Sequence, residues 1–269
     1  MPSGNEPELW DRLNAQHLLW KEQLGYVVHP RIPIKEKMMI ADVGTGTGIW
    51  PIQASKTLPR SAELHGYDID MTKFPPKPWL PHNVFGATWD AFSAVPPAMV
   101  GRYDIVHISI FMLVVAKNNP LPLLKNLIEM LKPGGYVQWD ELDWATKRIV
   151  QANPSNSTKE VQALLDHVAQ WEDPLGPFEW IADLPNIYAK QGLEKTAFDR
   201  FQMAPAYLRY DTDKFLASYE EFSHTILDAK GGNDGKHLRE LVSKASQESQ
   251  TGVATTADMI VAVARKPVS

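Results

Sequence analysis

One short stretch of this chain, MMIADVGTGTGIW from Met38 to Trp50, constrains the fold more than any other. An apolar run ends at Asp42, a glycine-rich turn follows, and apolar residues resume at Ile49. This order predicts a buried strand, a tight turn and the start of a helix. Glycine lets the backbone approach a ligand closely, and a helix N-terminus offers unpaired N–H groups. The glycines of this predicted ligand-binding turn are Gly44, Gly46 and Gly48.

The spacing of the glycines excludes two common nucleotide-binding turns. The dinucleotide fingerprint requires G-x-G-x-x-G, and the sixth position counted from Gly44 is Ile49. No G-K-[ST] follows the turn, which excludes a phosphate-cradling P-loop. The remaining Asp-x-Gly-x-Gly-x-Gly pattern suits a nucleoside ligand without phosphates.

Beyond the turn, strand-like and helix-like patterns alternate, which predicts a doubly wound α/β fold with a parallel sheet and helices on both faces. Near the C-terminus, a strand, a long excursion and a returning strand indicate an antiparallel edge. Strands are expected near residues 38–43, 62–70, 83–88, 102–111, 136–144, 193–201 and 254–267. Helices are expected near residues 8–24, 49–58, 121–131 and 153–171.

The chain is interpreted as one domain over residues 1–269, with two helical segments outside the alternating core. The first is an N-terminal segment, 1–36, and the second is an insertion at about 203–247 that carries a Gly-Gly-Asn-Asp-Gly hinge. Both are expected to form a cap over the site. The cofactor-binding core is expected at 37–150, followed by a C-terminal half at 151–269.

Composition narrows the class of partner. A net charge of −5 without any Lys/Arg run argues against nucleic-acid or anionic-membrane binding. The absence of cysteine excludes disulfides, thiolate metal sites and cysteine nucleophiles. The N-terminus has no apolar core of a signal peptide, and no apolar run approaches the roughly 20 residues that span a bilayer. We therefore expect a cytoplasmic protein.

Acids follow the second and third expected strands, where ligands bind in open α/β sheets. Asp68 lies about 20 residues beyond the glycines and is the better candidate to accept hydrogen bonds from ribose hydroxyls. Asp70 could instead cap a helix. Asp90 could accept from an exocyclic adenine amine, or could cap the next helix.

Several of these motifs together resemble the class I S-adenosylmethionine-dependent methyltransferases. The resemblance lies in ADVGTGTG, Asp68, Trp89-Asp90-Ala91, RYDIVHI and LKPGGYVQWDE, and covers roughly residues 38–144. The segments RLNAQH, HPRIP and LKPGGYVQWDELD are also similar to fungal secondary-metabolite methyltransferases, the branch of gliotoxin-type N-methyltransferases and LaeA-like proteins.

The resemblance implies a Rossmann-like, seven-stranded sheet with an antiparallel last strand and S-adenosylmethionine lying over the glycine turn. It carries Asp68 over as the ribose ligand and Asp90 as the adenine contact. The full set of expected cofactor-binding residues is Asp42, Gly44, Thr45, Gly46, Gly48, Asp68, Ile69, Trp89, Asp90, Ala91 and His107.

Two subfamilies fit poorly. HISIF stands where an Asn-Pro-Pro-Tyr motif would follow the fourth strand, which disfavours methylation of nucleic-acid or glutamine amino groups. A metal-dependent catechol enzyme would need several oxygen ligands, and Asp140 with Asn118 or Asn119 is not a convincing set. No metal is expected.

Methyl transfer needs alignment, exclusion of water and, for a phenol or alcohol, a base. Glu141 is preferred among the acids after the fifth strand, because alternation would point Asp140 and Glu141 to opposite sides. His107 lies in an apolar strand and is either packed there or close to the cofactor. His17 shares a helix face with Trp20 and is either a base or a core residue.

The expected function is S-adenosylmethionine-dependent methylation of a small, largely apolar or aromatic secondary metabolite at N, O or S, by a monomer or homodimer. An aromatic stripe in the insertion either packs in a core or lines the substrate pocket. Two alternatives stay open: a non-methylating cyclisation or rearrangement, and a LaeA-like regulatory role. The expected substrate-binding residues are Trp20, Phe111, Met112, Asp140, Tyr207 and Tyr210.

Overall fold

A computed structural model describes residues 6–172 and 175–268, and they group into two compact units. The sheet unit comprises Leu24–Asp143, Phe178–Phe201 and the chain from Met259 onward. The helical unit comprises the chain up to Gln23, Trp144–Pro177 and Gln202–Asp258.

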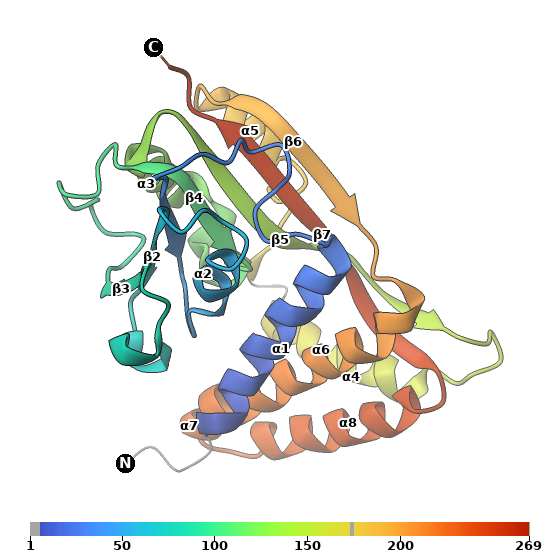
Figure 1. Cartoon of the computed structure of the whole chain (residues 1–269). Helices are drawn as coiled ribbons and strands as arrows, with labels where there is room; N and C mark the ends of the chain where they lie inside the picture. Colours follow the sequence, from blue (N-terminus) through green and yellow to red (C-terminus); the bar gives the residue numbers. More distant parts are fainter. Residues whose placement is uncertain (1–5, 173–174, 269) are drawn as a thin grey trace. The chain divides into compact units, whose positions relative to one another are not determined.

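The sheet has seven strands in the order β3-β2-β1-β4-β5-β7-β6 (Figure 1). Strands β1 to β5 pair in parallel, and β6 pairs antiparallel with β7. This confirms the predicted doubly wound sheet with an antiparallel last strand. The strands are β1 Met39–Val43, β2 Glu63–Asp68, β3 Val84–Thr88, β4 Tyr103–Ser109, β5 Leu131–Gln151, β6 Glu194–Phe201 and β7 Val253–Arg265.

The central strands are buried on both faces, which explains why they read as continuous apolar runs. Ile40 of β1, Ile105 and Ile108 of β4, and Val261 of β7 have no exposed surface. Each such side chain contributes about 1.5–3 kcal/mol through removal of apolar surface from water. This burial fixes the strand ends that carry the polar residues of the site.

The helices of the sheet unit are short. The longest, α3, buries Leu123, Leu124, Leu127 and Met130, which recur at helical spacing on one face. The expected helix at 49–58 ends already at Ala54 and continues as hydrogen-bonded turns. The helices are α2 Ile49–Ala54, α3 Leu121–Met130 and α5 Leu184–Lys190, with 3₁₀ turns η1 Met71–Lys73, η2 Lys77–Trp79, η3 Met112–Val114 and η4 Ala116–Asn118.

Strand β5 corrects one expectation. The predicted strand at 136–144 instead runs from Leu131 to Gln151, so Asp140, Glu141 and Asp143 lie inside it and not in an exit loop. The acids are tolerated within a strand because each has a partner. Asp140 pairs with His107, Asp143 pairs with Arg200, and Glu141 accepts backbone N–H groups.

In the helical unit, α8 packs against both α4 and α6. The helix predicted at 153–171 begins only at Lys159, and the predicted glycine break lies between α7 and α8. No helix of the described residues is long and apolar enough to cross a membrane. The helices are α1 Glu6–Leu24, α4 Lys159–Glu172, α6 Leu208–Phe222, α7 Asp228–Lys230 and α8 Asp234–Ser249, with a 3₁₀ turn η6 Pro205–Tyr207 and a π-helical turn Ser223–Leu227.

Candidate functional site

The glycine turn at the end of β1 has the backbone conformation that only glycine adopts readily. Gly44, Gly46 and Gly48 have φ values of 71°, 53° and 72°. The turn is fixed to the next strand, because the Gly44 and Thr45 N–H groups donate to the Tyr67 carbonyl at 2.8 and 3.0 Å. The turn is therefore held in a fixed conformation at the carboxyl ends of β1 and β2.

Asp68, the last residue of β2, lies beside this turn. One carboxylate oxygen accepts from Gly46 N–H at 2.8 Å, and the other accepts from Asp70 N–H at 3.1 Å. A carboxylate oxygen has two lone pairs, so each can accept a further hydrogen bond. Asp70 caps η1 by accepting from Thr72 N–H at 2.9 Å, which confirms the capping alternative for that residue. Ile69 between them is 70% exposed.

The segment after β3 is a tight turn. Asp90 accepts from Phe92 N–H at 2.9 Å and from the Ser93 hydroxyl at 3.1 Å within this turn. Among the described residues no helix lies between β3 and β4, so the alternative that Asp90 caps the next helix is wrong. Trp89 is buried, and its ring meets Tyr67 edge-on with centroids 6.1 Å apart. Ala91 is also buried. Trp89 and Ala91 therefore support the turn that presents Asp90.

His107 of β4 lies between two acids in the interior. One ring nitrogen is 2.6 Å from Asp42 Oδ1 and the other is 3.2 Å from Asp140 Oδ2. Burial alone would lower the pKa of His107, but the hydrogen bonds and charges of Asp140 and Asp42 outweigh it and raise the pKa to about 9. The ring also stacks on Trp50, with centroids 3.9 Å apart and 8° between the planes. Since both ring nitrogens are engaged, this geometry favours a structural role over proton abstraction.

The same buried network includes residues that the sequence reasoning missed. Gln138 donates from its amide to Asp140 and to the Val27 carbonyl, and its Oε1 accepts from His29 N–H at 2.9 Å. Register explains the cluster, because Asp42 lies beside His107 and His107 lies beside Gln138 across adjacent strands. The usable signal was the period of two in β5, which puts Gln138 and Asp140 on one face.

Glu141 faces the opposite side of β5, as the alternation predicted. It has no exposed surface, and its carboxylate accepts from Phe111 N–H at 2.7 Å and from Leu142 N–H at 3.1 Å. Burial raises the pKa of Glu141 to about 7, against the lowering effect of these N–H donors. A carboxylate enclosed by backbone donors holds a loop in place.

Phe111, which was expected to bind substrate, lies against the glycine turn. A Cβ placed on Gly44 would be 2.5 Å from Phe111 Cε2, so the ring occupies the space beside that glycine. The ring also stacks with Phe92 at a centroid separation of 6.2 Å. Its neighbour Met112 is buried. Phe111 therefore connects the turn after β1 with the turn after β3.

Comparison with known proteins identifies the family of this chain. A family model described as "Methyltransferase domain" matches residues 21–197, more than half of the chain. The chain belongs to the methyltransferase domain family. The resemblance inferred from the sequence motifs is confirmed, and membership supports S-adenosylmethionine as the cofactor.

Relatives of this methyltransferase include fungal proteins. It is 34% identical over 151 residues to methyltransferase grgD of a Penicillium species, a stretch covering 50% of each chain. It is 30% identical to N-methyltransferase gliN of Aspergillus fumigatus over 48% of this chain and 46% of the relative. The chain thus spans about half the length of these curated relatives.

Two further likenesses extend over more of the chain. The secondary metabolism regulator laeA of Gibberella zeae is 26% identical over 257 residues, which are 87% of this chain and 78% of the relative. Phosphoethanolamine N-methyltransferase 2 of Haemonchus contortus, solved with S-adenosyl-L-methionine, has a TM-score of 0.52 at 17% identity. That match covers 92% of this chain and 53% of the other, and it shows the shared fold alone.

Four expected site residues belong to the helical unit of the methyltransferase, and their roles stay predictions. His17 is half-buried on α1, and Trp20 on the same helix is buried. The Tyr207 hydroxyl donates to Glu22 at 3.2 Å, and Tyr210 is 63% exposed. In the insertion, Tyr219 is buried and hydrogen-bonded to Glu172, which fits core packing.

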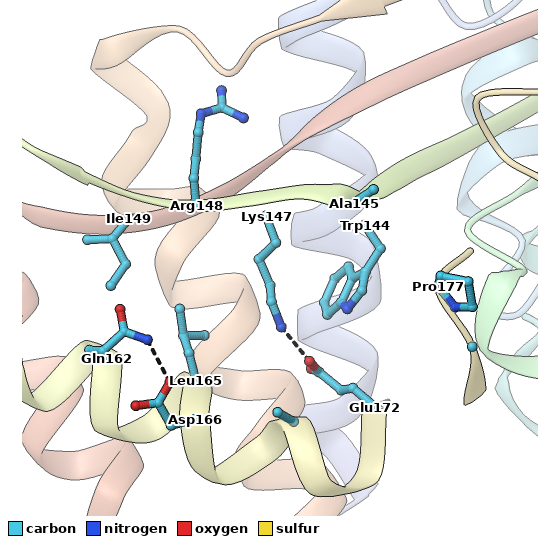
Figure 2. Close-up of a pocket in the computed structure, with 12 residues that line it drawn as sticks. Trp144, Ala145, Lys147, Arg148, Ile149, Gln162, Leu165, Asp166, Glu172 and Pro177 are labelled. Atoms are coloured by element: carbon cyan, nitrogen blue, oxygen red, sulfur yellow. Dashed lines mark hydrogen bonds and ion pairs between the residues drawn. The ribbon is translucent and has the colours of Figure 1, made fainter. Parts of the chain in front are cut away.

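The helical unit contains a cavity of about 520 Å³ between β5 and α4 (Figure 2). Lys147 forms an ion pair with Glu172 there and lies 4.5 Å from the centre of the Trp144 ring. This cavity was not predicted from the sequence, which indicated a pocket lined by the aromatic stripe of the insertion. Among the described residues, no group of three or more His, Cys, Asp or Glu is arranged to hold a metal ion.

Proposed function

We propose that this protein is an S-adenosylmethionine-dependent methyltransferase. The cofactor seat, the proposed binding site formed by Gly44, Gly46, Gly48 and Asp68, lies at the carboxyl ends of β1 and β2. The observation that carries the proposal is the bond from Gly46 N–H to Asp68, which joins the glycine turn to the expected ribose ligand in one site. Ligands of open α/β sheets bind at this edge.

The residues present fit the cofactor. Three glycines of positive φ let the backbone adopt this turn, with the Phe111 ring beside Gly44, and Asp68 has lone pairs for two hydroxyls. Exposed Ile69 offers an apolar surface for a base, and Asp90 is the candidate acceptor for an exocyclic amine. When bound, S-adenosylmethionine supplies a methyl group already activated on a sulfonium. The protein then contributes alignment and exclusion of water.

The state of the buried groups favours an amine or thiolate acceptor among the N-, O- and S-methylations. His107 is held between two acids, and the Glu141 carboxylate is enclosed by N–H donors. Neither is placed to take a proton from a phenol or alcohol, so such an acceptor would need the remaining expected base, His17. The likeness to gliN, named an N-methyltransferase, supports the same preference. The proposed substrate is a small, largely apolar or aromatic metabolite.

The cofactor seat is tested by replacing the acid beside the glycine turn. Asp68→Ala should weaken binding of S-adenosylhomocysteine by about tenfold or more, because charge-assisted hydrogen bonds are lost. Titration calorimetry measures this. Asp70→Ala is the matched control, since the Asp70 carboxylate caps η1 while its backbone N–H to Asp68 is kept, and the affinity should stay unchanged. Equal affinity of the Asp68 variant and the wild type would contradict the assignment.

A second candidate is a regulatory role, favoured by the laeA likeness over 87% of the chain. It predicts cofactor binding together with a stable protein complex and no turnover of a small molecule. A radiolabelled methyl donor offered to small-molecule extracts distinguishes the two. We further propose a cytoplasmic monomer or homodimer. The net charge of −5 supports the absence of a nucleic-acid partner.

A further inference from the structure

The turn that follows β4 has a strained backbone. Ile110 has a φ of +49°, a left-handed conformation that is unfavourable for a β-branched residue. Its N–H donates to the Asp140 carbonyl at 2.8 Å. Such a conformation persists only where surrounding contacts hold it.

The Glu141 carboxylate supplies contacts that hold the residues directly after Ile110. Its carboxylate accepts from Phe111 N–H at 2.7 Å and also from Met112 N–H. It further accepts from Leu142 N–H at 3.1 Å and from the Trp139 indole N–H at 3.3 Å. An anion that accepts several N–H groups makes bonds about twice as strong as neutral ones. Two of its four donors belong to the strained turn.

The turn after β4 places the Phe111 ring beside the proposed cofactor seat. The Phe111 ring fills the space next to Gly44, where an added Cβ would meet it at 2.5 Å. It also stacks with Phe92, two residues beyond Asp90. A shift of residues 110–112 would therefore move a wall that touches both the glycine turn and the Asp90 turn.

We propose that Glu141 is a positioning residue, whose carboxylate holds residues 110–112 so that the Phe111 ring stays against the glycine turn. The link to cofactor affinity rests on the proposed function. The anchoring of the turn does not, because it depends only on contacts within the sheet unit.

The charge state of Glu141 gives this role a signature. Burial raises its pKa to about 7, and the hydrogen bonds to N–H groups oppose that rise. Of the charged groups nearest in β5, Asp140 and its partner His107 lie on the other face, and Asp143, two residues beyond Glu141, is paired with Arg200. Protonation removes acceptor capacity from the carboxyl group. The turn should therefore be held firmly above pH 7 and loosely below it.

The anchoring is tested by amide hydrogen exchange at Phe111 and Met112 in the ligand-free protein. Protection factors, corrected for the intrinsic exchange rate at each pH, should rise about tenfold from pH 6 to pH 8 in the wild type. Glu141→Gln should show low protection at both pH values, because the amide cannot accept the same set of bonds. Asp143→Asn is the matched control, with the same change on the same strand at an acid that pairs with Arg200. High protection in Glu141→Gln, or loss in Asp143→Asn, would overturn the proposal.

A second measurement separates this proposal from the proposed function. At pH 8 the affinity for S-adenosylhomocysteine should fall about tenfold in Glu141→Gln and stay unchanged in Asp143→Asn. Unchanged affinity in Glu141→Gln overturns the positioning role even if the exchange data support the anchor. If the wild type does not bind S-adenosylhomocysteine at all, the proposed function fails, and the exchange measurement still decides the anchoring.

Discussion

Asp140 and Glu141 are neighbours in β5 on opposite faces of the strand, yet their buried charges are compensated by opposite means. On one face, Asp140 and Asp42 flank the His107 ring, whose raised pKa keeps it a cation. On the other face, Glu141 has only neutral N–H donors. The first arrangement is an ionic cluster, and the second is a carboxylate held by neutral donors.

This difference separates a rigid part of the site from a responsive one. The His107 ring keeps its proton across the neutral range, because the flanking carboxylates raise its pKa to about 9. Glu141 changes charge near pH 7, because burial is opposed by hydrogen bonds alone. The carboxylate that holds the turn after β4 is thus the one that responds to pH.

The largest expected effect comes from removing His107 from the ionic cluster. His107→Ala leaves Asp42 and Asp140 buried without a cation and should lower the free energy of unfolding by about 3–5 kcal/mol. Urea denaturation at pH 7 measures the loss. His65→Ala is the control, because its acidic partner Glu63 is exposed at the surface. Equal losses in the two variants would show that the ionic cluster adds nothing to stability.

The next effect distinguishes the two faces by pH. The folded-state pKa of Glu141, about 7, lies above its ordinary value of 4.5, so the folded protein binds this proton more tightly. The free energy of unfolding should therefore fall by roughly 3 kcal/mol as the pH rises from 4.5 to about 7. The contribution of His107 is present below its ordinary pKa of 6.5 and is lost as the pH rises through about 9.

Denaturation curves at half-unit pH intervals separate the two windows. Glu141→Gln should remove the fall in stability as the pH rises from 4.5 to about 7. The fall as the pH rises from 6.5 to about 9, which His107 causes, should remain. A Glu141→Gln profile that matched the wild type would place the acid-side titration on another residue.

The smallest expected effect concerns the strained turn. Ile110→Asn replaces a β-branched residue at positive φ with one that tolerates this conformation, and it also removes a half-buried apolar side chain. The two changes oppose each other, so the free energy of unfolding should change by less than about 1 kcal/mol. A loss above about 2 kcal/mol in chemical denaturation would mean that packing of Ile110, and not Glu141, holds the turn.

The parts of the site that are local in sequence could be predicted. The glycine turn and Asp68 are about 20 residues apart on successive strands, and simple alternation placed Asp140 and Glu141 on opposite faces. The pairing of His107 with Asp42 could not be predicted, because it depends on the register of strands that are not consecutive in the chain. The same holds for Phe111 beside Gly44.

The long β5 was also out of reach of the sequence. Three acids in four residues resemble a loop, and only their partners explain why they remain in a strand. Arg200, which pairs with Asp143, lies far along the chain in β6. A charge inside a strand becomes predictable only when its counter-ion is known.

The division of the chain into two units has a consequence for its modularity. The boundary falls inside both β5 and β7, between Asp143 and Trp144 and between Asp258 and Met259, and at three more points of the chain. Neither unit is therefore a continuous segment that could be excised or exchanged. The family match ends at residue 197, within β6 and before β7, so even the recognised methyltransferase segment lacks strands that complete its sheet. For this protein, the stretch that identifies the family is shorter than the stretch that forms the sheet.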